Sequence, residues 1–219
     1  MRRCLRGVKL PASIPLDQMK FPVEFFDDLS IAEHGPWRVR ERWYEQRKRS
    51  LVLAALPRSH YINGLDLGCG VGVLSAQMAA RCRCDRLTAV DASGAAIALA
   101  RFYLSEQRNV ALQHVAIPAQ WPAGRFDLIV LSEAGYYLDR QSLSAVADRI
   151  SESLDADGTL LLCHWRHPVD GAELSALAIH AALARRAHLS RLSRVDDEDF
   201  LLDVFERNPR SIAAREGIV

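Results

Sequence analysis

A glycine-rich turn that begins with an acidic residue is the segment of this sequence best suited to bind a ligand. The run Leu-Asp-Leu-Gly-Cys-Gly-Val-Gly places Asp66 ahead of Gly68, Gly70 and Gly72. Glycines at this spacing let a ligand approach main-chain N–H groups, that of Cys69 included. The spacing differs from the GxGxxG of dinucleotide-binding proteins, and a carboxylate here suits a ligand with an ammonium group. The structural alternative is a turn without ligand, in which Asp66 caps the next helix.

A second acidic residue, Asp91, ends the next predicted strand, 19 residues beyond Gly72. In a parallel sheet the end of this strand lies beside the glycine turn. The Asp91 carboxylate, with Ala92 next to it, can then accept hydrogen bonds from both hydroxyls of a ribose. NAD-binding proteins use the same device, so Asp91 discriminates between ligands only in combination with the glycine spacing.

Three side chains follow the fourth predicted strand, where the carboxyl ends of parallel strands open onto a ligand crevice. Glu133 could hold an ammonium group or accept a proton from an incoming amine, and a solvated loop carboxylate is the alternative. Tyr136 and Tyr137 could pack against a cation or a sugar face, although core packing would also account for them. We take Glu133 and Tyr136 as catalytic candidates and Tyr137 as a substrate-binding candidate.

The segment His164-Trp165-Arg166-His167 follows the fifth predicted strand. Two imidazoles, an indole and a guanidinium at one crevice would form an acceptor site. There His164 could act as a base near neutral pH, and Trp165 and Arg166 could bind substrate. Taken singly, each of these residue types is more often structural. A metal held by His164 and His167 would need further ligands that the sequence does not supply, so we expect no metal site.

These candidates require a scaffold of short apolar strands that alternate with helices. We expect strands at residues 62–67, 87–90, 110–115, 126–131 and 159–163. We expect helices at residues 73–81, 95–106, 141–154 and 171–186. Elements in this alternation form βαβ units with right-handed crossovers around a parallel sheet.

The last third of the chain departs from this alternation. Strands at 189–195 and 200–206 flank an acidic tip at 196–199, which is too short for a helical crossover, so the two strands must be antiparallel. The predicted fold is an α/β, doubly wound, Rossmann-like fold with a seven-stranded, mostly parallel sheet that ends in an antiparallel β-hairpin. This core spans residues 59–207, and a C-terminal tail follows at 208–219.

The N-terminal region carries its own predictions. Residues 1–20 contain two prolines and little periodicity, which indicates a loose tail in which Met19 could be the true translation start. Residues 21–58 form an arginine-rich helical cap that could fold over the ligand. Within this cap Trp37 and Tyr44 are substrate-binding candidates, and most of the charged side chains are expected in solvent.

Composition narrows the class of protein. The length of 219 residues suits one domain, here 21–219, and a net charge of +1 gives no sign of nucleic acid or an anionic membrane as partner. No apolar run approaches the roughly 18 residues of a membrane-spanning helix. The basic start lacks the apolar segment of a secretory signal, and the cysteines are irregularly spaced, so we expect a cytoplasmic protein with reduced thiols. The sequence carries no signal for an oligomeric state.

The glycine turn, Asp91 and the strand Phe-Asp-Leu-Ile-Val at 126–130 resemble motifs of class I S-adenosylmethionine (SAM)-dependent methyltransferases. The segment Leu-Asp-Ala-Asp-Gly at 154–158 is similar to a turn of that family. The resemblance spans about residues 60–165, and the sheet of that superfamily also ends in an antiparallel hairpin.

This resemblance implies SAM as the cofactor. The expected cofactor-binding residues are Asp66, Gly68, Cys69, Gly70, Gly72, Asp91, Ala92, Ala116, Ile117 and Glu133. Many relatives carry an Asp after the third strand that binds the adenine amine, and this chain has Ala116 and Ile117 there. Main-chain groups and apolar contact would therefore hold the adenine.

A narrower resemblance is to the nodulation N-methyltransferases (NodS-like). It rests on Gly-Pro-Trp at 35–37, Trp-Tyr-Glu-Gln-Arg-Lys at 43–48 and Ser-Glu-Ala-Gly-Tyr-Tyr-Leu at 132–138. Val-Phe-Glu-Arg at 204–207 and Arg-Glu-Gly at 215–217 are also similar. Those enzymes methylate the free amine of a partly deacetylated chitooligosaccharide.

We therefore predict a SAM-dependent methyltransferase that acts on the nitrogen of an amino sugar, an oligosaccharide or a small amine. A neutral amine is already a good nucleophile, whereas an alcohol needs a base. The alternatives are an O-methyltransferase acting on a sugar or small metabolite, and a catalytically silent SAM-binding regulatory module. A nicotinamide oxidoreductase is a further alternative, against which the glycine spacing and Asp66 count.

Overall fold

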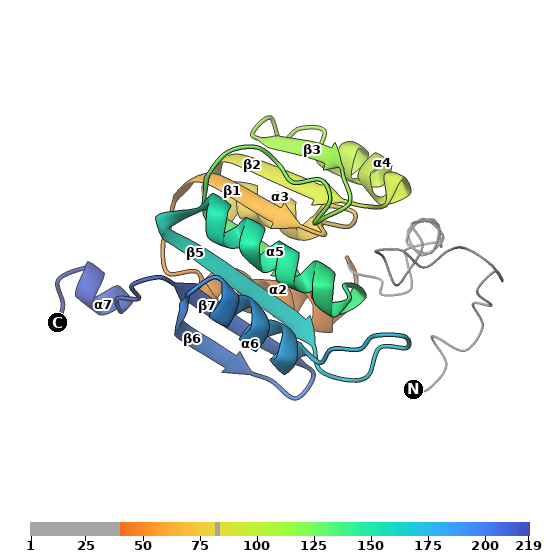
Figure 1. Cartoon of the computed structure of the whole chain (residues 1–219). Helices are drawn as coiled ribbons and strands as arrows, with labels where there is room; N and C mark the ends of the chain where they lie inside the picture. The colour runs from red at the N-terminus through yellow and green to blue at the C-terminus, as the bar shows by residue number, and fades with distance from the viewer. Residues whose placement is uncertain (1–39, 82–83) are drawn as a thin grey trace.

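The computed structural model describes residues 40–81 and 84–219, in which seven strands form one sheet (Figure 1). The strands are β1 (Tyr61–Leu67), β2 (Cys84–Asp91), β3 (Val110–His114), β4 (Phe126–Ser132), β5 (Leu154–Trp165), β6 (Ser190–Asp196) and β7 (Phe200–Glu206). Their order is β3-β2-β1-β4-β5-β7-β6. Within this sheet β7 runs antiparallel to both of its neighbours, β5 and β6, and the other neighbouring pairs are parallel. The predicted doubly wound fold with a terminal hairpin is confirmed.

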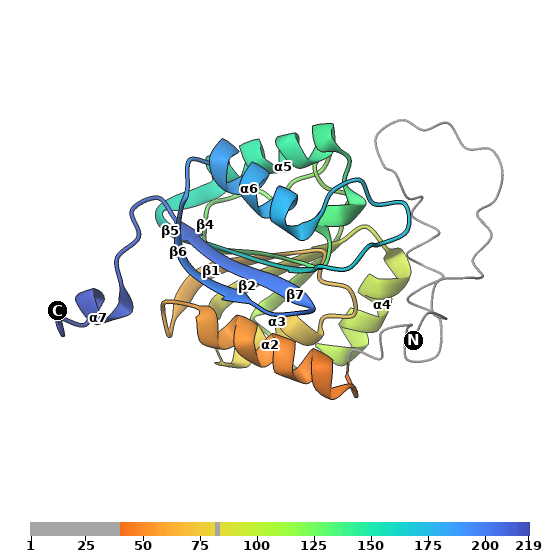
Figure 2. The ribbon, with the colours of Figure 1, turned by 90° about the horizontal axis from the view of Figure 1, so that it is seen from below.

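Helices cover both faces of the sheet (Figure 2). One face carries α2 (Trp43–Ala55), α3 (Val73–Arg81) and α4 (Gly94–Tyr103), and the other carries α5 (Arg140–Ser153) and α6 (Ala176–Arg186). A separate apolar cluster fills the space under each layer, as a two-sided sheet requires. Within the described residues, no helix combines the length and apolarity needed to cross a lipid bilayer.

Among the element boundaries that differ from the sequence expectation, two have a visible local cause. Helix α6 begins at Ala176 rather than at residue 171, because the Ser175 hydroxyl accepts a hydrogen bond from the Ala178 N–H and caps the helix there. Residues 154–158, expected as a turn, form the start of β5. A register shift opposite the beginning of β4 lets this extra length pair with the sheet.

The described part of the predicted N-terminal cap is helix α2. Helix α2 packs against the sheet, where Val52 and Leu56 join the cluster that contains Leu128. Its charged residues Lys48 and Glu45 are buried rather than solvated. An amphipathic pattern shows that one face is covered but does not show by what. The predictions for the tail at 1–20, for Met19 and for Trp37 fall outside the described residues.

The sheet register brings the candidate residues to one edge. Leu67 at the end of β1 pairs with Val90 of β2 and Leu131 of β4, and Ser132 pairs with Cys163 of β5. Because β7 runs antiparallel, its first residues pair with the last residues of β5, and the acidic hairpin tip lies at this edge as well. At the other end of the chain the C-terminal tail carries a short helix, α7 (Ile212–Arg215), which stands away from the core in Figure 1.

Candidate functional site

The glycine turn after β1 leaves room for a ligand. Gly68 and Gly70 have φ angles of 75° and 54°, in the left-handed region that favours glycine. A Cβ on Gly68 would lie 2.5 Å from the Cβ of Ala134, so this glycine permits close contact with the segment that follows β4. A Cβ on Gly70 would meet no described atom within 4 Å. The turn is thus packed against the protein at one glycine and open at the next.

Asp91 is bonded to this turn. One carboxylate oxygen accepts a hydrogen bond from the Gly70 N–H at 2.8 Å, and the other accepts one from the Ser93 N–H at 2.9 Å. Burial raises the pKa of Asp91, while these hydrogen bonds oppose the rise. A carboxylate has about four acceptor positions, so Asp91 can still accept hydrogen bonds from ribose hydroxyls, and this role stays a prediction.

Asp66 is turned into the protein. It is 2% exposed, and its carboxylate accepts a hydrogen bond at 2.6 Å from the hydroxyl of Ser75, in the first turns of α3. Burial raises the pKa of Asp66 to about 6. This inward position matches the alternative in which Asp66 braces the following helix better than it matches direct contact with a ligand.

The other predicted cofactor contacts also lie at this edge, mostly as main-chain groups. The Cys69 N–H donates to the Val90 carbonyl at 2.9 Å, and burial raises the pKa of the Cys69 thiol well above its ordinary value, so the thiol stays protonated. The Ala92 carbonyl lies 2.9 Å from Nε2 of His114. Ala116 and Ile117 are half-buried just beyond β3, whose last residue pairs with Asp91, and Ile117 packs against the apolar cluster under α5 and α6.

Glu133 lies directly after β4 with a φ of 59°, a conformation that a non-glycine residue rarely adopts. Its Oε2 accepts a hydrogen bond from the Tyr136 hydroxyl at 2.7 Å, and its Oε1 lies 3.3 Å from Nζ of Lys48. Burial raises the pKa of Tyr136 well above its ordinary value, so the hydroxyl remains a donor. Oε1 is buried and makes no hydrogen bond within the described part of the chain.

Aromatic side chains adjoin this carboxylate. The rings of Tyr136 and Tyr137 meet edge to face with centroids 4.7 Å apart, and those of Tyr44 and Trp165 meet in the same way at 5.6 Å. Nζ of Lys48 lies 4.9 Å from the centroid of the Tyr44 ring. The buried Tyr44 hydroxyl makes no hydrogen bond to any described residue. The arrangement combines flat apolar surfaces with charge, which suits a cation or a sugar.

The geometry argues against His164 as a base. His164 is fully buried, its Nε2 accepts a hydrogen bond from the Gly135 N–H at 3.0 Å, and its Nδ1 lies 2.9 Å from His180. Both nitrogens are therefore occupied, and neither can take a proton from an acceptor. Alternation along β5 turns this side chain toward α6 rather than toward the crevice.

Arg166 and His167 also differ from expectation. Arg166 pairs with Asp196 and donates to the Asp197 carbonyl at 2.8 Å, while His167 pairs with Asp199 at 2.8 Å. Both side chains thus hold the tip of the β6–β7 hairpin. In this arrangement Arg166 is occupied by the hairpin, and Trp165 is the residue of this segment that lies beside Tyr44.

Sequence reasoning missed Lys48 as a partner of Glu133. The helical spacing that puts Lys48 on the same face as Tyr44 is a signal that could have suggested it, because residues four apart are neighbours on a helix. Its second neighbour, Glu45, lies 3.2 Å away on the same helix. No comparable signal marks Ala134, whose contact with Gly68 depends on the tertiary fold.

The strand order, the glycine turn and the acid at the end of β2 define a class I SAM-dependent methyltransferase. The chain belongs to the nodulation protein S (NodS) family, whose family model matches residues 26–197. Nodulation protein S of Sinorhizobium fredii is 27% identical over 188 residues, which cover 81% of this chain and 86% of that protein.

Two solved structures support this assignment. The crystal structure of N-methyltransferase NodS from Bradyrhizobium japonicum WM9 in complex with S-adenosyl-L-homocysteine (SAH) is similar with a TM-score of 0.76 and 26% identity, covering 86% of this chain and 98% of that one. A provisionally assigned methyltransferase from Pseudomonas syringae has 46% identity and a TM-score of 0.65, covering 76% of this chain and 100% of that one. The predicted family resemblance is confirmed.

Proposed function

We propose that this protein transfers the methyl group of SAM to the nitrogen of an amine carried by an amino sugar, an oligosaccharide or a small molecule. The observation that carries the proposal is the place of Glu133. The next residue, Ala134, packs against Gly68, so Glu133 is one residue away from the contact with the glycine turn, at the carboxyl end of β4. A carboxylate at that place can bind an ammonium group and receive a proton from it.

The turn fits the cofactor in its chemistry. Gly70 is open on the side of its missing Cβ, and Asp91 offers two oxygens for ribose hydroxyls. When bound, SAM supplies a methyl group activated by its sulfonium. The solved NodS structure that contains SAH is 26% identical to this chain, and it supports SAM as the cofactor here.

The protein's own part in the reaction is mainly positioning. Tyr136 holds the Glu133 carboxylate, and the rings of Tyr44, Tyr137 and Trp165 would orient the acceptor and exclude water. Holding both reactants in line can account for much of the acceleration of such a displacement. An alcohol acceptor would need a base, and His164 cannot serve as that base because it is buried and hydrogen-bonded. This favours an amine nitrogen over a hydroxyl oxygen as the methyl acceptor.

Calorimetric titration with SAM, SAH and NAD tests the cofactor. We expect SAM and SAH to bind and NAD not to bind, and Asp91→Ala to weaken SAH binding about 100-fold, since it loses several hydrogen bonds to a charged acceptor. Asp127→Ala is the matched control. Asp127 also accepts two main-chain N–H groups, from Ile62 and Asn63, but it lies near the start of β4. Binding of NAD alone would refute the proposal.

Methyl transfer is then measured with SAM and a chitooligosaccharide that carries one free amine, beside its fully acetylated counterpart. We expect methylation of the free amine and none of the acetylated chain, located by mass spectrometry of the fragments. Methyl groups on sugar hydroxyls would favour O-methylation. SAH binding without turnover on amino sugars or on a panel of small amines would favour the silent regulatory module.

A further inference from the structure

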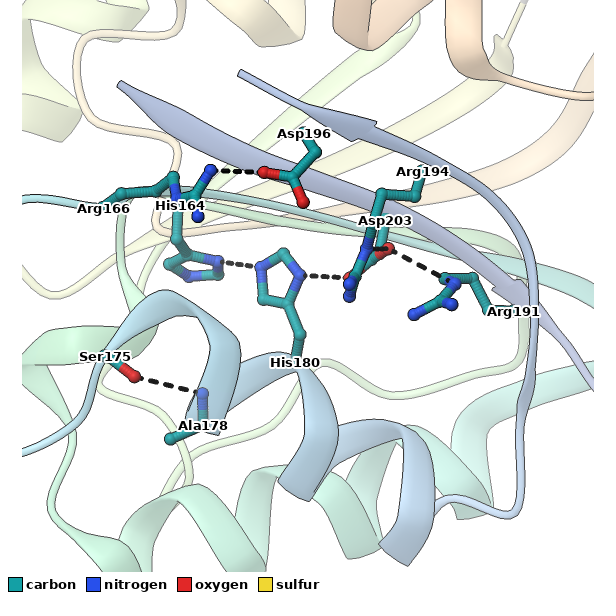
Figure 3. A network of polar contacts seen from close by, with 9 residues as sticks. All are labelled: His164, Arg166, Ser175, Ala178, His180, Arg191, Arg194, Asp196 and Asp203. Carbon is teal, nitrogen blue, oxygen red and sulfur yellow. Dashed lines mark hydrogen bonds and ion pairs between the residues drawn. The ribbon is translucent and has the colours of Figure 1, made fainter. Parts of the chain in front are cut away.

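A network of polar side chains, buried over most of its length, runs from the hairpin to the turn after β4, and Figure 3 shows it from Arg194 to His164. Nδ1 of His164 lies 2.9 Å from Nε2 of His180, and Nδ1 of His180 lies 2.8 Å from Oδ2 of Asp203. Arg194 donates to both oxygens of Asp203, at 2.7 and 2.6 Å. His164, His180 and Asp203 are each at most 1% exposed. The network thus links β6, β7, α6 and β5.

The hydrogen bond at the His164 end of this polar network fixes the position of every proton in the network. The main-chain N–H of Gly135 donates to Nε2 of His164 at 3.0 Å, so that nitrogen carries no proton. Nδ1 of His164 must then donate to Nε2 of His180, and Nδ1 of His180 must donate to Asp203. Burial keeps the pKa of both histidines below its ordinary value, which agrees with two neutral rings in this one arrangement.

The turn after β4, which the polar network holds at Gly135, carries residues of the candidate site. Gly135 opens the 3-10 turn η1 (Gly135–Tyr137). A Cβ on Gly135 would lie 2.7 Å from Nε2 of His164, so the contact requires glycine at this position. Immediately before it, Glu133 has its left-handed backbone and Ala134 touches Gly68 of the glycine turn. Immediately after it, Tyr136 donates to Glu133.

We infer that His164, His180 and Asp203 are positioning residues, which hold the Gly135 amide and thereby set Glu133 and Tyr136 beside the glycine turn. The inference rests on the proposed function and extends it to side chains that touch neither cofactor nor acceptor. Three buried polar residues carry a desolvation cost that apolar packing would avoid, and strained backbone persists where its surroundings fix it. The network of His164, His180 and Asp203 supplies that constraint for the backbone at Glu133.

The first test is the nuclear magnetic resonance spectrum of the wild-type imidazole nitrogens. We expect both His164 and His180 to hold their proton on Nδ1, with a scalar coupling between the Gly135 amide and Nε2 of His164. A proton on Nε2 of His164 would overturn the inference, because that nitrogen could then not accept from Gly135. This measurement needs neither SAM nor an acceptor, so its outcome is separate from that of the proposed function.

The second test compares His180→Leu with Thr159→Val. Thr159 donates from β5 to Glu206 at 3.1 Å, so its variant also removes one buried polar contact of that strand, but away from the turn. We expect His180→Leu to raise the hydrogen-exchange rate of the Gly135 amide at least tenfold and to weaken SAH binding about threefold to tenfold. Thr159→Val should change neither value by more than twofold.

Equal effects of the two variants, or an unchanged Gly135 amide in folded His180→Leu, would show a merely structural network. If His180→Leu does not fold, the wild-type spectrum alone decides. If the wild-type protein binds no SAH, the proposed function fails. The exchange rate of the Gly135 amide still shows whether the network of His164, His180 and Asp203 holds this amide.

Discussion

The ammonium group of Lys48 lies 3.3 Å from Oε1 of Glu133, which joins helix α2 to the carboxyl end of β4. The Lys48 side chain is 6% exposed and that of Glu133 is 30% exposed. Burial alone would lower the pKa of Lys48, but Glu133 and Glu45 raise it above its ordinary value. Lys48 therefore stays charged and balances two carboxylates at the edge of the candidate site.

Replacing Lys48 by Met should destabilise the protein by about 2–3 kcal/mol, because it leaves Glu45 and Glu133 without their shared cation. A fully buried pair would lose more, but water reaches part of Glu133. Urea unfolding at pH 7.5 measures the loss. Arg47→Met is the matched control, since Arg47 pairs with Asp197 but its side chain is 43% exposed, and we expect less than about 1 kcal/mol. Equal losses in the two variants would contradict a special role for Lys48.

The sequence was sufficient to predict the sheet and its glycine turn because these depend on local patterns. Apolar runs of strand length, helical periodicity between them and two adjacent strands at the end determine the topology almost completely. β7 (Phe200–Glu206) agrees with its predicted bounds. The acid at Asp91 was recognisable because the end of β2 must lie beside the end of β1 in such a sheet.

The contacts of the site could not be predicted in the same way, because they join segments that are far apart in the chain. Lys48 reaches Glu133 only because α2 packs on the sheet, and nothing local shows that packing. His164, expected just after the fifth strand, is the penultimate residue of β5, and its side chain lies on the same side of the strand as Leu162, whose cluster faces α5 and α6. Its partners His180 and Asp203 come from α6 and β7.

Tyr136→Phe and Glu133→Gln should each lower the turnover number with a free-amine acceptor by about tenfold or more, since a hydrogen bond to a charged group contributes about 1.5–3 kcal/mol. Because Tyr136 acts through Glu133, the double variant should be barely slower than Glu133→Gln alone. Steady-state kinetics with saturating SAM gives the comparison. Independent, multiplying effects would show that the Tyr136 hydroxyl does not act through this carboxylate.

Asp66→Asn should stabilise the protein at pH 7.5. The folded-state pKa of about 6 lies above the ordinary value of 3.8, so the ionised carboxylate destabilises the fold above pH 6, and this penalty vanishes below pH 3.8. We expect a gain of about 1–3 kcal/mol at pH 7.5 that shrinks toward pH 4, measured by urea unfolding at both values. If Asp66 braces α3, SAH affinity should stay within threefold. A tenfold loss would instead make Asp66 a cofactor ligand, as the sequence suggested.

The buried histidines should make the protein less stable in mild acid. His164 and His180 have lowered pKa values in the folded state, so as pH falls through about 6.5 the unfolded chain takes up protons that the folded chain does not. Their contribution is fully present above pH 7 and is lost as pH falls toward the folded values. Asp66 partly opposes the trend, since it binds a proton in the folded state near pH 6.

The net expectation is a free energy of unfolding about 1 kcal/mol lower at pH 6 than at pH 7.5, measured by urea unfolding at constant ionic strength. His180→Leu should show roughly a third of this dependence, because one of the two histidines that resist protonation is gone while the opposing contribution of Asp66 remains. Equal or higher stability at pH 6 would mean that the folded protein accommodates a charged His164 or His180. The single proton arrangement that connects Asp203 to the Gly135 amide would then not persist below neutral pH.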